Sequence, residues 1–502
     1  MEINGEFLEE SVRELRQYFR SGSTRSVTWR KNQLTALLDL VHKNEDAISE
    51  SLYQDLGKHP VEAFRDEIGA IGKSATYSLS CSDIPLLFFP AKGEVLAEPL
   101  VSFFDFFLLC LFDERFSYQQ KISIEALNVP MSYLFLTIVL ALDPLIGAIA
   151  AGNVVVIKPS EQAPACSSFL ANTIPRYLDS NAIRVIEGGA AVSQQLLLQK
   201  WDKIFFTGSP RVARFVMSAA AKNLTPVTLE LGGKCPAILD SLTNPSDFKL
   251  AVKRIVGGKW GPCSGQACIG IDYVLVEEKV SSHLVELLKK IVRRFYGDNP
   301  LESKVISRIV NKQNFTRLCN LLKDPLVAAS IVHGGSVEEK HLFIEPTILL
   351  DPPLDADVMT EEIFGPLLPI ITVNKIGESI EFINSRPKPL AIYAFTKDET
   401  LKRRILTETS SGSVTFNDTM VQFLCDTLPF GGVGQSGFGR YHGKYSFDTF
   451  SHEKAVMHRS LCLEIEPRYP PWSKFKLEFL RLAYKLNYFG LLLHILGLKR
   501  YK

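Results

Sequence analysis

Apolar residues near the N-terminus recur with helical spacing. Over residues 7–56, leucine, valine and aromatic side chains stand three or four positions apart among mixed charges, as in Leu8, Val12 and Leu15. This spacing is typical of helices that bury one face and expose the other. It predicts two helices that pack on the surface of the protein.

Between about residues 145 and 240 the pattern changes, and short apolar runs alternate with helical stretches. The runs Asn153–Ile157 and Lys203–Phe206 are rich in β-branched or aromatic residues and end at turn-forming residues. Helical spacing then covers residues 165–177, 193–199 and 212–221. Strands that alternate with helices predict a parallel, doubly wound sheet.

Residues 240–420 repeat this alternation. Helices are expected over residues 246–256 and 280–296, and strands over Tyr273–Val276 and Ile370–Val373. The chain therefore predicts an α/β fold with two doubly wound, Rossmann-like domains. Ligand sites often form between domains, so we expect the chemistry near the seam between these two.

Composition narrows the classes of function. The 502 residues include 56 lysines and arginines against 55 aspartates and glutamates, which leaves a net charge of +1. This balance gives no electrostatic footprint for nucleic acid, and no recognition motif for it is present. The nine cysteines are odd in number and form no metal-type pairs. They favour unpaired thiols in a reducing compartment and no metal site.

One cysteine and one glutamate form a candidate catalytic pair. Cys268 lies in the stretch Gly265–Ile269, and Glu230 lies 38 residues before it in Glu230–Lys234. A thiolate adds readily to a carbonyl carbon, and a carboxylate can accept a proton and later activate water. Covalent oxidation of an aldehyde needs both groups. Either residue alone is more often an ordinary core residue.

Two strand ends provide candidate nucleotide contacts, although the GxGxxG fingerprint is absent. The turn Thr207–Pro210 follows a predicted strand and opens a helix. Gly208 lets the backbone approach a ligand, and the helix N-terminus at Ser209 favours phosphate. A second strand ends in a lysine and a carboxylate, Lys158 and Glu161, which can hydrogen-bond to ribose hydroxyls. Each turn alone is equally typical of a plain helix cap or an exposed turn.

Six motifs in this order resemble the aldehyde dehydrogenase superfamily. They are Lys158–Glu161, Phe206–Ser209, Glu230–Lys234, Gly265–Cys268, Glu362–Pro366 and Pro429–Gly434. Further motifs are similar to the class 3 branch, which includes fatty-aldehyde enzymes and plant relatives: Gly434–Gly437, Tyr441–Lys444, Phe447 and Phe450–His452. The resemblance covers residues 7–100 and 144–500.

The resemblance implies a role for each motif residue. Cys268 is the expected nucleophile and Glu230 the expected general base. The implied cofactor is NAD, with NADP as an alternative, because the Glu161 carboxylate would repel a 2′-phosphate. The implied cofactor contacts are Lys158 and Glu161 at the adenine ribose, Gly208 and Ser209 at the pyrophosphate, Glu362 at the nicotinamide ribose and Phe364 beside the nicotinamide.

The implied reaction is oxidation of medium- or long-chain aldehydes to carboxylic acids through a cysteine thiohemiacetal and a thioester. Two alternatives stay open. One is a catalytically impaired variant that keeps the fold and binds nucleotide or membrane. The other uses the same thiol to transfer acyl groups or cleave esters without net redox.

The resemblance also implies a homodimer and a division of the chain into four parts. These parts are residues 1–231 for the N-terminal helices and the NAD-binding domain, 232–420 for the catalytic thiol domain, 421–460 for a return to the nucleotide domain with an oligomerisation β-arm, and 461–502 for a helical tail.

Residues 101–143 depart from the family. Relatives carry a Trp-Asn-x-Pro motif there, whose Asn amide holds the developing oxyanion, and losing one such donor costs about 10²–10³ in rate. This chain has no Trp-Asn pair; Asn128 is the nearest equivalent but lies seven residues too early, and Phe135 stands at the expected position. We therefore expect residues 101–140 to derive from a retained intron or an altered splice join, which displaces a native strand and the Asn loop.

The tail, residues 470–502, mixes basic and apolar side chains. Its apolar run Tyr488–Leu496 is nine residues long, whereas a membrane-spanning helix needs about twenty. The pattern predicts a basic amphipathic helix on an anionic membrane surface. The alternative is a helix that covers the substrate entrance of its own or a partner subunit.

The location of the protein follows from the ends of the chain and from one apolar stretch. The segment Met1–Glu6 has no signal-peptide pattern, so we expect a cytoplasmic protein, with the surface of the endoplasmic reticulum or another membrane as an alternative. The stretch Tyr133–Ile157 is largely apolar, but its second half matches the nucleotide domain. We therefore do not expect it to span a membrane.

Overall fold

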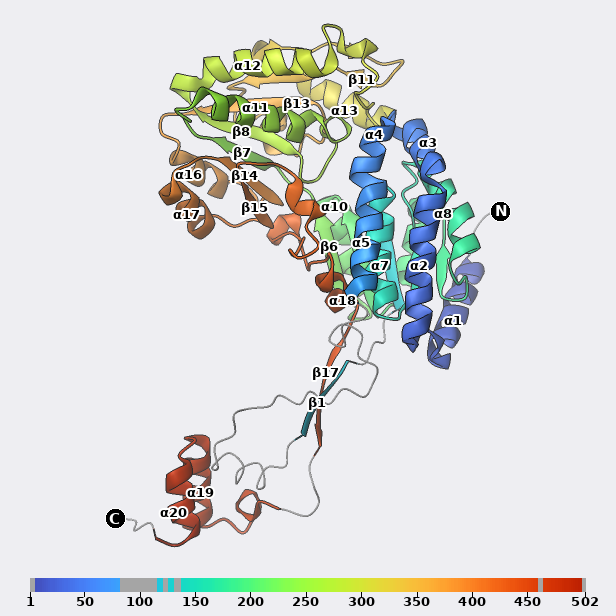
Figure 1. The fold of residues 1–502 in the computed structure, drawn as a ribbon, viewed down its shortest axis with the longest axis vertical. Coiled ribbons are helices and arrows are strands. Elements are labelled where there is room, and N and C mark those ends of the chain that lie inside the picture. Colours follow the sequence, from blue (N-terminus) through green and yellow to red (C-terminus); the bar gives the residue numbers. More distant parts are fainter. Residues whose placement is uncertain (1–4, 82–114, 121–124, 131–136, 459–463, 499–502) are drawn as a thin grey trace. The chain divides into compact units, whose positions relative to one another are not determined.

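The protein is described by a computed structural model that covers residues 5–81, 115–120, 125–130, 137–458 and 464–498. The chain divides into two compact units (Figure 1). The first is built from residues 1–90 and 120–452, and the second from residues 91–119 and 453–502. The first unit carries both large sheets.

Helices make up the N-terminal part. They are α1 (Gly5–Ser21), α2 (Val27–Lys43), α3 (Glu45–Leu56), α4 (Pro60–Ala63), the π-helical turn η2 (Phe64–Ile68) and α5 (Gly69–Cys81). The prediction of two helices over residues 7–56 is wrong in number, because three form there. Ser26 begins α2 by accepting a hydrogen bond from the Trp29 backbone N–H, and Asn44, with non-helical backbone angles, separates α2 from α3.

The first sheet has six strands. In spatial order they are β16 (Gly437–Phe438), β6 (Val227–Leu231), β5 (Lys203–Gly208), β2 (Glu125–Pro130), β3 (Val154–Ile157) and β4 (Ile183–Val185). All pairs are parallel except β16 with β6. The helices among these strands are α7 (Val139–Ala150), α8 (Pro164–Tyr177), α9 (Ala190–Leu198) and α10 (Pro210–Ala221). This is the predicted doubly wound arrangement.

The second sheet has seven strands. In spatial order they are β15 (Ser413–Phe416), β14 (Ala391–Phe395), β7 (Cys235–Leu239), β8 (Ile271–Glu277), β13 (Leu367–Val373), β12 (Thr347–Leu350) and β9 (Ile331–His333). Helices α11 (Pro245–Trp260) and α12 (Glu278–Tyr296) pack beside β8, and α16 (Glu378–Asn384) and α17 (Glu399–Glu408) lie near β14 and β15 (Figure 1). Two such sheets confirm the predicted α/β fold class.

Short elements complete the first unit. They are α13 (Lys312–Lys323), α14 (Pro325–Ala329), α15 (Asp357–Thr360), α18 (Lys444–Thr449), the strand pair β10 (Val337–Glu338) and β11 (Phe343–Ile344), and the 3-10 turns η1 (Ser23–Arg25), η3 (Cys263–Gly265), η4 (Pro300–Glu302), η5 (Val421–Leu424) and η6 (Gly434–Ser436). Among them, η3 leads directly into the candidate nucleophile.

The atypical segment contributes a strand to the first sheet. Residues 125–130 form β2, which pairs in parallel with β3 on one side and β5 on the other. The atypical segment therefore supplies a strand of this sheet itself, and its origin from a retained intron or an altered splice join stays a prediction. Backbone N–H and C=O groups in the middle of a buried sheet must be paired, and any extended run of suitable length can pair them. Phe135 lies outside the described residues, and Asn128 lies within β2 in register with Phe205.

The second unit has its own small elements. Strand β1 (Arg115–Gln120) pairs with β17 (Glu453–His458), and the turn η7 (Glu466–Arg468) precedes α19 (Lys474–Tyr484) and α20 (Tyr488–Ile495). The predicted single amphipathic helix is thus two helices, because the chain reverses at Leu486, whose φ is +51°. None of the helices in the described parts of the chain has the length and apolar character needed to cross a membrane.

The packing of α7 depends on a glycine. The backbone of Gly147 lies so close to α18 that an added Cβ would stand 2.5 Å from the Ser446 Cβ. A larger residue would therefore force α7 away from the element that follows Tyr441 and His442. By contrast, a Cβ at Gly257 in α11 would meet nothing within 4 Å among the described atoms.

We expect Gly147→Ala to lower the free energy of unfolding by about 1–3 kcal/mol, because overpacking strains a close contact. Gly257→Ala should raise it by roughly 0.5–1 kcal/mol, because alanine is the better helix former. Urea titration of both variants measures the two effects. Equal effects of the two substitutions would contradict the packing role of Gly147.

Candidate active site

Glu230 lies near the carboxyl end of β6, on the side of the first sheet where the carboxyl ends of its parallel strands meet. It is in register with Thr207 of β5 and with Gly437 of β16. Its side chain is buried, and both carboxylate oxygens lack a hydrogen-bond partner among the described residues. Burial raises the pKa of Glu230 well above its usual range. A buried carboxyl without a structural partner is typical of a functional group rather than of a structural one.

The segment that leads to Cys268 has an unusual backbone. Cys263, Ser264 and Gly265 have φ angles of +43°, +56° and +82°, all in the left-handed region. A Cβ at Gly265 would collide with the carbonyl oxygen of Gly365. Glycine is therefore required at this position, and the thiol segment packs directly against the segment Glu362–Pro366.

The Gln266 side chain holds this backbone in place. Its amide nitrogen donates to the carbonyl oxygens of Cys263 and Arg308, both at 2.8 Å, and its amide oxygen accepts from the Val310 backbone N–H at 3.1 Å. The segment Glu362–Pro366, against which this backbone packs, is also held: the Trp260 indole N–H donates to the carbonyl oxygen of Pro366 at 2.8 Å. These bonds fix the segment that presents Cys268.

Cys268 is partly exposed and interacts electrostatically with both candidate carboxylates. Burial raises the pKa of its thiol, and the charges of Glu362 and then Glu230 raise it further. The structure thus brings Cys268, Glu230 and Glu362 together, as the sequence predicts. The thiol is the resting form, and its ionisation requires a base or a nearby positive charge.

Glu362 is held by its neighbours on both sides. A Cβ at Gly232 would collide with the Glu362 carboxylate, so the glycine makes room for it. Asp272 forms an ion pair with Lys234 and accepts from the Ile363 backbone N–H at 3.0 Å. The third residue of the motif Glu230–Lys234, Gly232, and its last residue, Lys234, therefore help to position Glu362.

Two further hydrogen bonds fix the backbone around Glu362. Lys234 donates to the carbonyl of Glu361 at 2.8 Å, and Arg317 donates to the carbonyl of Ile363 at 2.6 Å. Phe364 follows with a φ of +48°. The sequence marked Glu362 and Phe364, but nothing local in it marked Asp272 or Arg317.

The predicted ribose and phosphate contacts lie at the ends of two strands of one sheet. Lys158, fully buried after β3, forms an ion pair with Glu161 at 2.5 Å, and burial lowers its pKa. Gly208 ends β5, and the Ser209 hydroxyl begins α10 by accepting from the Val212 backbone N–H at 3.4 Å. Because carboxyl ends of parallel strands meet at one edge, both groups face the same crevice as β6.

Two buried residues near this edge were not assigned roles from the sequence. Tyr441 is buried, and desolvation followed by the charges of Glu230, Asp143 and Cys268 raises its pKa well above the usual range. The Thr207 hydroxyl, in register with Glu230, is buried without a partner in the described parts of the chain. Tyr441 and Thr207 both lie within motifs quoted above. Their place in those motifs was the feature of the sequence that could have marked them as site residues.

A cavity of about 300 Å³ opens beside the thiol segment. Six of the residues that line it are Arg65, Gly258, Pro262, Ile269, Met420 and Phe423. One lining residue, Ile269, follows Cys268 in the chain, so the cavity lies beside the thiol segment. Within the described residues, no group of three or more His, Cys, Asp or Glu side chains is placed to hold a metal ion.

Comparisons with known proteins agree with this geometry. Residues 124–456 match the family model that is described as "Aldehyde dehydrogenase family". The chain is 57% identical to aldehyde dehydrogenase family 3 member F1 of Arabidopsis thaliana over 100% of both chains. It is 40% identical to aldehyde dehydrogenase family 3 member A2 of Mus musculus over 97% of both chains. These matches confirm the predicted resemblance, class 3 branch included.

Solved structures give the same result for the fold. The substrate-bound state of AldH from Staphylococcus aureus has a TM-score of 0.86 and 39% sequence identity, covering 95% of this chain and 99% of that one. The P. syringae indole-3-acetaldehyde dehydrogenase AldA, in complex with NAD+, has a TM-score of 0.78 at 22% identity, covering 91% and 90%. The second likeness concerns the fold alone.

Glu230→Gln should stabilise the protein at alkaline pH. The pKa of Glu230 is raised in the folded state, so wild-type stability is fully present below the unfolded pKa and falls as pH rises through the folded pKa. The neutral glutamine avoids that loss, and we expect a gain that grows from near zero at pH 4.5 to about 1–3 kcal/mol at pH 9.

Unfolding midpoints of both proteins across this pH range measure the effect. Glu286→Gln is the matched control, because Glu286 lies on the exposed side of α12. A gain that is the same at every pH would contradict the buried, uncompensated carboxylate.

Proposed function

Since the chain belongs to the aldehyde dehydrogenase family, we propose that it oxidises medium- and long-chain aldehydes to carboxylic acids with NAD, using Cys268 as nucleophile and Glu230 as general base. One observation carries this assignment. A partly exposed thiol interacts with two carboxylates, Glu230 and Glu362, and a cavity reaches its neighbour Ile269. The mouth of this cavity is where the aldehyde would enter.

The residues present fit a dinucleotide. Lys158 and Glu161 would bind the adenine ribose, and Gly208 and Ser209 the pyrophosphate at the N-terminus of α10, where free backbone N–H groups favour anions. Glu362, fixed by the space at Gly232, would bind the nicotinamide ribose, with Phe364 beside the ring. When bound, NAD supplies the hydride acceptor. The Glu161 carboxylate favours NAD, and NADP is the alternative.

The raised pKa of Cys268 and the raised pKa of Glu230 indicate which group must lose a proton and which can accept it. Cys268 rests as a thiol, so its proton must leave as sulfur bonds to the carbonyl carbon. The raised pKa of Glu230 makes its carboxylate form a stronger base, and this carboxylate would accept the proton. After hydride loss the acyl group is a thioester on sulfur. Glu230 releases the thiol proton to solvent and then takes a proton from water as the hydroxide adds to the acyl carbon; the Cys268 thiolate leaves and takes that proton from Glu230.

A second candidate function has one observation in its favour. The chain lacks the Trp-Asn pair, and Asn128 stands two register positions before Pro130, which pairs with Thr207 at the level of Glu230. Without an amide donor at the oxyanion, the rate would fall by about 10²–10³. The chain would then be a catalytically impaired variant that keeps the fold and the nucleotide site.

Cys268→Ala should abolish NADH formation with a panel of aldehydes, lowering kcat by at least about 10³-fold, because no other group can form the thioester. Glu230→Gln should slow both the first equivalent of NADH and the steady state by about 10²–10⁴-fold, because thiol deprotonation and thioester hydrolysis both lose their base. Stopped-flow absorbance measures both. Turnover that survives in Cys268→Ala would reject the mechanism, and wild type that binds NAD without turnover would support the impaired variant.

We also propose a homodimer and a contact with membranes. The sheet β1–β17 has two strands, and its outer edges carry backbone groups suited to pair with a second copy. In the tail, Trp472, Tyr484 and Phe489 are 66%, 88% and 66% exposed. Exposed Lys474 and Lys485 stand among them. Apolar side chains interleaved with cations favour an anionic bilayer surface.

The membrane contact predicts flotation with phosphatidylserine vesicles. The double variant Trp472→Ser, Phe489→Ser should reduce the bound fraction by about tenfold, because it removes apolar surface that the bilayer would bury. Leu198→Ser, which removes a similarly exposed apolar side chain of the first unit, serves as control. Equal soluble fractions for wild type and double variant would count against the contact.

A further inference from the structure

The thiol segment adopts a backbone that its own residues do not favour. Cys263 and Ser264 are not glycines, yet both have left-handed φ angles. Such conformations persist only where surrounding contacts impose them, and they cluster at functional sites. The contacts that impose this one come from outside the segment.

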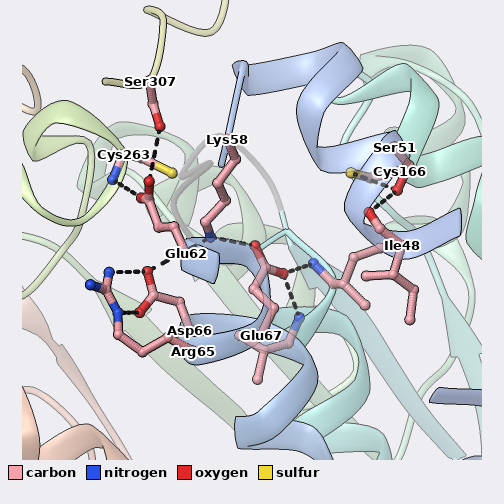
Figure 2. A network of polar contacts seen from close by, with 12 residues as sticks. Ile48, Ser51, Lys58, Glu62, Arg65, Asp66, Glu67, Cys166, Cys263 and Ser307 are labelled. Carbon is pink, nitrogen blue, oxygen red and sulfur yellow. Dashed lines mark hydrogen bonds and ion pairs between the residues drawn. The ribbon is translucent and has the colours of Figure 1, made fainter. Parts of the chain in front are cut away.

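Glu62 in α4 provides the first of these contacts (Figure 2). Its Oε1 accepts a hydrogen bond from the Cys263 backbone N–H at 2.7 Å, and its Oε2 accepts from the Ser307 hydroxyl at 3.4 Å. All three residues are buried. A buried backbone N–H must be paired, and the Glu62 carboxylate pairs this one.

Ser307 closes the contact on its other side. Its carbonyl oxygen accepts from the Ser264 hydroxyl at 2.7 Å, while its own hydroxyl donates to Glu62. The two strained residues are therefore held by adjacent members of one network. Cys263 is bound through its backbone and Ser264 through its side chain.

The residues on either side of this short helix, Lys58 before it and Glu67 in η2 after it, connect it to the nucleotide half (Figure 2). Both side chains are fully buried, and they form an ion pair at 2.9 Å. The second oxygen of Glu67 accepts from the backbone N–H groups of Ile138 at 2.8 Å and Val139 at 3.2 Å, where α7 begins. One helical segment thus fixes both the thiol turn and the start of α7.

We propose that Glu62 is a positioning residue that holds the strained turn Cys263–Gly265 and thereby aims Cys268 at the carbonyl carbon. The proposal rests on the proposed function, because it requires Cys268 to be the nucleophile. Glu62 itself is not among the residues that line the cavity. It acts through the backbone at Cys263 and through Ser307.

Two substitutions separate the hydrogen bonds from the charge. Glu62→Gln keeps an acceptor for the Cys263 N–H and places an amide donor beside the Ser307 hydroxyl. Glu62→Leu removes both. Glu286→Leu is the control, because Glu286 is an exposed glutamate of α12. Each full-length variant is first checked for folding by circular dichroism.

We expect Glu62→Leu to lower kcat by at least about tenfold with little change in the KM for aldehyde, because a small displacement of a nucleophile is costly. Its Cys268 should also react with iodoacetamide at a rate that differs at least fivefold from wild type, measured by mass spectrometry of the peptide that carries Cys268. Glu62→Gln should stay within about threefold of wild type in both assays.

If Glu62→Leu folds and keeps wild-type kcat and alkylation rate, the proposal is overturned. Equal losses in Glu62→Gln and Glu62→Leu would overturn it too, because the charge would then matter and the hydrogen bonds would not. Should Glu62→Leu fail to fold, Ser307→Ala decides. It removes one bond to Glu62 but keeps the carbonyl that binds Ser264, and an unchanged alkylation rate would reject the role.

Alkylation needs no turnover, so this experiment stays informative if the proposed function fails. NADH formation that survives Cys268→Ala would reject the catalytic assignment whatever the alkylation rates show. Normal dependence of NADH formation on Cys268, with no effect of Glu62→Leu, would reject only the positioning role.

Discussion

The site depends on how closely two backbone segments approach each other. Gly265 lies against the carbonyl of Gly365, and Gly232 lies against the Glu362 carboxylate, and in each place a side chain would occupy the space of its neighbour. The thiol of Cys268 and the two carboxylates can interact only because these contacts exist. The strained turn, the ion pair of Lys234 with Asp272 and the cavity at Ile269 are all arranged around them.

Local requirements explain what the sequence could predict. A turn that demands glycine, or a strand end followed by a helix cap, is encoded within a few residues, so the six motifs identify the family and the two Rossmann-like sheets. Cys268, Glu230 and Glu362 lie inside such motifs, and the structure brings them together.

Contacts between distant segments explain what the sequence could not predict. Glu62 and Cys263 are 201 residues apart, and Asp272 and Ile363 are 91 apart. No local periodicity marks such pairs. The same holds for β2, whose residues show no alternation of apolar and polar positions but form backbone bonds to β3 and β5. The sequence did not predict the break between α2 and α3 at Asn44, because the helical spacing of apolar residues continues across it.

The anchoring of α7 by Glu67 has a consequence for how the family varies in length. Residues 82–138 join the end of α5 to the start of α7, and Glu67, in the turn η2 that leads into α5, accepts hydrogen bonds from the backbone at the start of α7. The entropic cost of closing a loop grows only with the logarithm of its length, so doubling the length of this connection lowers the free energy of unfolding by about 0.6 kcal/mol. Evolution can therefore lengthen or rewrite this connection at low thermodynamic cost while both of its ends stay in place.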